Sequence, residues 1–132
     1  MDIADADGVM NVTEEDQQKI NRFARLNARL EDVKDEISSK TNELKNYEDA
    51  LGEAELKVLE DEGDKLHLQV GDIMVNLPVD ETQAWLESKM SALRGSVVEL
   101  DKRKDAIVEE MTLLKANLYA RFGNNIHLES GP

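Results

Sequence analysis

The stretch KLHLQVGDIMVNLP, residues 65–78, decides the fold because it is the one place where apolar and polar side chains alternate. Alternation predicts a β-hairpin, and Gly71-Asp72 reads as a two-residue turn with glycine at its first central position. Counting outward from this turn puts six aliphatic side chains on one face: Leu66, Leu68, Val70, Ile73, Val75 and Leu77. A lone hairpin is marginal in water and has two open edges, so we expect these six residues to form an assembly face.

A long helix is predicted before the hairpin, from about residue 14 to about residue 58. Thr13 is expected to cap it, and the acidic residues that follow suit the positive end of the helix dipole. One row of residues recurs every seven positions: Phe23, Leu30, Ile37, Leu44, Leu51 and Val58. A second row lies three residues later: Leu26, Val33, Lys40, Tyr47 and Ala54. This spacing is typical of a coiled-coil seam, and a helix of roughly 65 Å needs an equally long partner.

The partner is predicted after Pro78, as a helix over about residues 81–122 that starts at Asp80 and Gln83. Its seam is equally regular, with one row at Leu86, Leu93, Leu100, Ile107 and Leu114 and another at Met90, Val97, Lys104, Met111 and Leu118. Two matched seams joined by a short hairpin must run antiparallel. The register that follows sets Leu30 against Met111, Leu44 against Val97 and Leu51 against Met90. The expected fold class is therefore mainly α, a long antiparallel coiled-coil helical hairpin with one β-hairpin at its closed end.

Lys40 and Lys104 occupy inward positions of the seams, where apolar side chains are usual. Two interpretations stay open. The lysines can fix the register of the coil, or their aliphatic stems can lie over the seam while the ammonium groups reach water.

Composition argues against several classes of function. The 132 residues carry a formal net charge of −13 and contain no cysteine, which disfavours nucleic acid or an anionic membrane as the main partner. No apolar run is long enough to span a bilayer and no secretory signal is visible, so we expect a location in the cytoplasm or the nucleus.

Chemistry-bearing motifs are equally scarce. His67 and His127 are the only histidines, and neither has a companion ligand at a spacing that metals require. We find no nucleophile elbow and no glycine-rich phosphate loop. The sequence therefore predicts a protein that is not an enzyme and binds no cofactor or metal.

One structural domain is expected over residues 13–123. Residues 1–12 are predicted to be a disordered acidic tail and residues 124–132 a flexible C-terminal tail, with Gly123 as the C-cap of the second helix.

The segments NVTEEDQQKINRFARL (11–26), QVGDIMV (69–75) and LYARFGNNIHLE (118–129) resemble β-type subunits of the prefoldin family. The resemblance implies a hetero-hexamer of two α-type and four β-type subunits, in which the hairpins join multi-subunit β-barrels. It also implies a holdase that captures unfolded actin or tubulin at its coiled-coil tips and delivers it to the cytosolic chaperonin without ATP. The alternative is a coiled-coil adaptor that docks a folded partner in a larger scaffold.

Four apolar residues gather where the first helix begins and the second ends: Ile20, Phe23, Tyr119 and Phe122. As an apolar cluster at a free end, they are the candidate client-binding residues at the tip. A second interpretation is that these residues, with Ile126 and Leu128 folding back, seal the fraying end of the coil.

Overall fold

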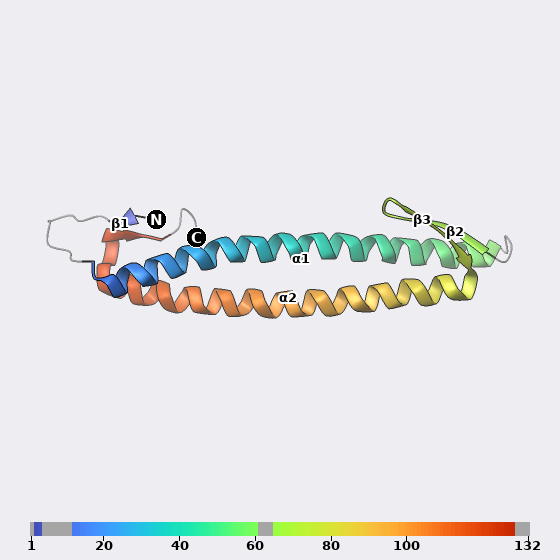
Figure 1. Ribbon diagram of the computed structural model, residues 1–132. Helices are drawn as coiled ribbons and strands as arrows, with labels where there is room; N and C mark the ends of the chain where they lie inside the picture. Colours follow the sequence, from blue (N-terminus) through green and yellow to red (C-terminus); the bar gives the residue numbers. More distant parts are fainter. Residues whose placement is uncertain (1, 4–11, 61–64, 129–132) are drawn as a thin grey trace. The chain divides into compact units, whose positions relative to one another are not determined.

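The computed structural model describes residues 2–3, 12–60 and 65–128. Its elements in chain order are β1 (Asp2–Ile3), α1 (Glu14–Glu60), β2 (Lys65–Val70), β3 (Ile73–Pro78), α2 (Val79–Phe122), the 3-10 helix η1 (Gly123–Asn125) and β4 (Ile126–His127) (Figure 1). Two long helices and one antiparallel hairpin confirm the predicted mainly α fold class. Membership of a multi-subunit β-barrel stays a prediction.

The start of α1 follows from a reciprocal cap between two side chains. The backbone amide of Asp16 donates to Oγ1 of Thr13, and the amide of Thr13 donates to Oδ2 of Asp16, both at 3.0 Å. Two of the amide groups that a helix N-terminus leaves unpaired are thereby satisfied. The predicted cap at Thr13 is confirmed, and Asp16 is the partner that completes it.

The hairpin matches its predicted register residue for residue, from Lys65 opposite Pro78 to Val70 opposite Ile73. Helix α2 then begins at Val79, so Asp80 lies inside the first turn and not before it. The completely buried Thr82 hydroxyl donates a 3.0 Å hydrogen bond to the carbonyl of Pro78. This bond satisfies a polar group that burial would otherwise penalise.

The chain forms two compact units by its tertiary contacts, and the single domain expected over residues 13–123 stays a prediction. Unit 1 contains residues 1–34 and 102–132, and unit 2 contains residues 35–101. Both long helices contribute to both units.

Unit 2 has a core in which the hairpin packs against both helices. Its buried members come from every element of the unit: Tyr47, Ala50, Ala54, Leu68, Val70, Val75, Leu86, Met90 and Leu93. The partly buried Leu44, Leu51, Val79 and Trp85 pack against them. Seam positions of both helices therefore share their core with the hairpin.

Unit 1 joins the first part of α1 to the last part of α2, and the two chain ends meet there. Gly123 has φ +58°, a left-handed conformation that ends α2 as predicted. The chain then turns into β4, which pairs antiparallel with β1 through Asp2 opposite His127 and Ile3 opposite Ile126.

The expected disordered and flexible tails stay predictions, although β1 and β4 lie within them. Ile126 and Leu128 are buried, with exposed fractions of 1% and 3%, because folding back removes their aliphatic side chains from water. The other parts of the predicted tails, residues 1, 4–11 and 129–132, lie outside the described residues.

Candidate interaction surfaces

The aliphatic face of the hairpin is covered by the chain's own helices. Leu68, Val70 and Val75 have exposed fractions of 0%, 5% and 7% and belong to the core of unit 2. Ile73, which the same alternation assigns to this face, is 58% exposed. The side chains of Leu66 and Leu77 lie outside the described residues. Three of the six predicted assembly residues are thus anchors of the hairpin to α1 and α2.

The parts of the hairpin that stay accessible are its turn end and its strand edges. Met74 is 67% exposed, and it stands beside the exposed Ile73. Among the described residues, β2 and β3 form a sheet of two strands, so their outer edges have no neighbouring strand. Unpaired strand edges are templates for further strands.

The turn itself lies against α1. Gly71 has φ +59°, and a Cβ added there would come within 3.2 Å of the Asn46 side-chain nitrogen. Glycine suits this position chiefly because the backbone is left-handed, and a Cβ would in addition displace the Asn46 side chain slightly. The predicted turn, with glycine at its first central position, is confirmed.

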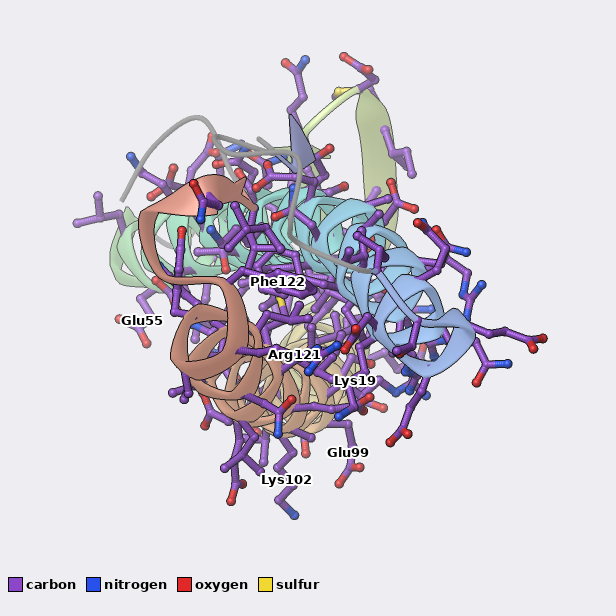
Figure 2. All side chains as sticks on the ribbon, turned by 90° about the vertical axis from the view of Figure 1, so that its left-hand side faces the viewer. Lys19, Glu55, Glu99, Lys102, Arg121 and Phe122 are labelled. Atoms are coloured by element: carbon purple, nitrogen blue, oxygen red, sulfur yellow. The ribbon has the colours of Figure 1, made fainter. Side chains whose placement is uncertain are left out.

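The predicted client-binding residues are mostly inside unit 1. Ile20, Phe23 and Phe122 have exposed fractions of 6%, 1% and 2%, and only Tyr119 is half-buried. Figure 2 shows Phe122 pointing between the two helices. With Ile126 and Leu128 also buried, this arrangement matches the interpretation in which these residues seal the end of the helix pair.

An ion pair between Arg121 and Asp16 joins the two helices at the same end of unit 1. Arg121 Nε donates a 2.6 Å hydrogen bond to Oδ2 of Asp16, whose carboxylate is almost fully buried. Burial alone would raise the pKa of Asp16. The hydrogen bonds from Thr13 and Arg121 outweigh it and hold this pKa below its ordinary value, so the carboxylate stays ionised.

Two further contacts join the helices of unit 1. The Arg22 guanidinium donates to Glu110 through Nε at 2.6 Å and through Nη2 at 3.0 Å. This fork lowers the pKa of Glu110 and raises that of Arg22. Lys19 Nζ donates at 3.0 Å to the side-chain oxygen of Asn117.

An apolar groove that sequence reasoning missed runs along unit 1. It has a volume of about 160 Å³ and is lined by Phe23 and Leu30 from α1 and by Val108, Met111, Thr112 and Lys115 from α2. Val108 is 43% exposed. Val108 directly follows the seam residue Ile107 and lies on a flank of the helix where polar residues are usual. This apolar residue was the feature of the sequence that could have indicated the groove.

Other sequence-based expectations concern metals, membranes and the seam lysines. In the described ranges, no cluster of three or more His, Cys, Asp or Glu residues could hold a metal ion. No described helix is long and apolar enough to cross a membrane. Lys40 and Lys104 are both half-buried, so their role stays a prediction.

Two long helices joined through an antiparallel β-hairpin define a class of helical-hairpin protein. The profile of the family described as "Prefoldin subunit" matches residues 17–125. The chain belongs to the prefoldin subunit family, and it is therefore a prefoldin chaperone subunit.

Individual relatives make the similarity more specific. The chain is 40% identical over 121 residues to a probable prefoldin subunit 4 of Drosophila melanogaster, an alignment that covers 92% of this chain and 86% of the relative. It is 39% identical over 121 residues to prefoldin subunit 4 of Homo sapiens, with 92% and 89% covered. It is 36% identical over 118 residues to prefoldin subunit 4 of Saccharomyces cerevisiae, with 89% of each chain covered.

A solved structure supports the fold. The prefoldin beta subunit from Thermococcus strain KS-1 matches 86% of this chain and 96% of its own, with a TM-score of 0.69 and 20% identity. The resemblance to β-type prefoldin subunits, and to subunit 4 in particular, is confirmed.

Proposed function

We propose that this chain is one subunit of a hetero-hexameric holdase of two α-type and four β-type subunits, which works without ATP in the cytoplasm or the nucleus. It captures unfolded proteins of the actin or tubulin type and delivers them to the cytosolic chaperonin. Catalysis, cofactors, nucleic acid and membranes have no part in this function. The observation that carries the proposal is the solvent-open apolar groove of unit 1, because an unfolded client presents apolar side chains and no fixed shape.

Assembly would use the hairpin, through its edges more than through its buried face. In a hairpin with a two-residue turn, the pair next to the turn is hydrogen-bonded, so Gln69 and Met74 direct their backbone groups outward. A neighbouring subunit's strand can pair with these groups and cover Ile73 and Met74. Leu68, Val70 and Val75 then act indirectly, by fixing the hairpin on α1 and α2.

Assembly is tested at Met74. Met74→Pro removes one outward N–H donor, whereas Met74→Ala removes a similar side chain and keeps the donor. We expect the proline variant to lose co-elution with the other subunits while the alanine variant retains most of it. Fluorescence of Trp85, the only tryptophan, reports whether unit 2 stays folded. Full co-elution of a folded proline variant would show that this edge is not used.

Client binding would use the apolar groove, which Phe23 helps to line, in place of the buried Ile20 and Phe122. Contacts of one shallow groove are weak, and several subunits that hold one client multiply them through effective concentration. Tyr119, which is half-buried, can add to the apolar surface. This arrangement needs neither a shaped pocket nor a nucleotide.

The test compares two exposed aliphatic residues of α2. Val108→Ser reduces the groove, and Leu113→Ser removes an exposed side chain, 66% accessible, that does not line it. In the assembled complex, we expect Val108→Ser to weaken suppression of aggregation of denatured actin and Leu113→Ser to leave it unchanged. Equal effects of the two variants on aggregation would show that the groove does not bind the client. No suppression by the unmodified complex would favour the adaptor hypothesis instead.

A further inference from the structure

Charge is distributed very unevenly in this acidic chain. Unit 2, residues 35–101, holds 17 acidic residues and 6 basic ones. The helical segments of unit 1, residues 14–34 and 102–122, hold 8 acidic residues and 10 basic ones. Five of the six arginines lie in unit 1. Although the whole chain has a net charge of −13, the helical segments of unit 1 are weakly basic and rich in guanidinium groups.

Three of these arginines line a second groove of unit 1, distinct from the apolar one. It has a volume of about 300 Å³. The lining residues are Arg22, Leu26 and Arg29 from α1 and Arg103, Ala106, Ile107 and Glu110 from α2. Leu26 and Ile107 are buried seam residues, so the groove has an apolar floor between basic walls.

The one carboxylate in this lining is already engaged. Both oxygens of Glu110 accept hydrogen bonds from Arg22, which neutralises that pair. In the part of the chain that the structure describes, Arg29 and Arg103 form no hydrogen bond or ion pair. Two exposed guanidinium groups, one from each helix, therefore remain available on the two sides of the apolar floor.

We propose that this groove binds an acidic polypeptide segment that carries an aliphatic side chain between carboxylates. Guanidinium groups form forked, charge-assisted hydrogen bonds with carboxylates, and Arg is preferred to Lys where that geometry matters. The apolar floor accommodates the aliphatic side chain, which a purely electrostatic patch would not select. The proposal concerns binding by unit 1 alone and does not depend on holdase activity.

The experiment measures fluorescence anisotropy of a fluorescein-labelled peptide of alternating Glu and Leu, titrated with the full-length chain. Arg29→Gln with Arg103→Gln should weaken binding about tenfold or more, because two charge-assisted contacts are lost. The matched control, Arg25→Gln with Lys34→Gln, removes the same charge from exposed residues of unit 1 outside the groove. We expect it to change the affinity less than about twofold, as charge changes on exposed surfaces do.

Two comparison probes complete the test. A peptide with Gln in place of Glu should bind much more weakly, and rising salt should weaken binding of the acidic peptide. Equal losses in both double variants, or equal affinity for the Gln peptide, would overturn the proposal. Stronger binding of a single-stranded RNA with the same dependence on Arg29 and Arg103 would assign the groove to nucleic acid instead.

Discussion

Arg121 in the last turn of α2 and Asp16 in the first turn of α1 are joined by a 2.6 Å hydrogen bond between Nε and Oδ2, across 105 positions of sequence. Each charge also suits the dipole of its own helix, with the acid at an N-terminus and the base at a C-terminus. The same carboxylate caps α1 through Thr13. One side chain thus stabilises a helix start and holds the end of the second helix against it.

Asp16→Asn should lower the melting temperature of the chain by a few degrees at pH 7, because the ion pair to Arg121 is lost while the size of the side chain is kept. The pKa of Asp16 in the folded chain lies below its ordinary value of 3.8. A carboxylate of this kind contributes stability that is present above the ordinary pKa and is lost as the pH falls through the folded-state pKa. Circular dichroism melts should therefore show the two proteins converging below about pH 4. A constant difference across that range would contradict this role.

Phe122→Ser should destabilise unit 1 by about 3 to 5 kcal/mol, the usual result of truncating a buried aromatic side chain. The reason is its exposed fraction of 2%. Urea unfolding followed by circular dichroism measures the change. Leu113→Ser serves as the control, since a residue that is 66% exposed should change stability little. If Phe122→Ser left stability unchanged and weakened client binding, Phe122 would be a client-contact residue and not a structural one.

Gly71→Ala should destabilise unit 2 by about 1 to 2 kcal/mol, because alanine is strained in the left-handed region. Gly52→Ala should do the opposite and stabilise α1 by up to about 1 kcal/mol, since a Cβ at that exposed helical position meets nothing within 4 Å. Trp85 fluorescence during urea unfolding follows both variants, because its ring packs edge-to-face on Tyr47 at 5.6 Å in the same unit. Destabilisation by both would show that Gly52 has a structural role of its own.

Lys40→Leu with Lys104→Leu should raise the melting temperature if the half-buried lysines only lay their stems over the seam. Each leucine would then contribute about 1 kcal/mol of apolar burial. Thermal melts and sedimentation of the assembled complex together decide between the two interpretations. A lower melting temperature or an altered assembly size would favour the role in register.

Much of the fold could be predicted because helix and strand periods are local properties of the sequence. Seam residues such as Phe23, Leu26, Leu93 and Leu100 are buried, as the heptad repeat predicts. The alternation on both sides of Gly71 determines the hairpin register. These features need only neighbours a few residues away, so no tertiary information was required.

The candidate surfaces were harder to predict. Periodicity states which residues share a face, but it does not state what covers that face. The aliphatic side chains of the hairpin were expected to meet partner subunits, and Leu68 and Val75 instead lie under the chain's own helices. The apolar cluster of Ile20 and Phe122 was similarly left with two interpretations.

By itself, the sequence determined the two helices and the hairpin between them, because each depends on a repeat that is visible along the chain. Only the tertiary structure decided that Arg121 meets Asp16 and that Arg29 and Arg103 flank one groove. Such contacts join residues far apart in the chain, and their formation depends on where the backbone places them in space. No local repeat encodes that position.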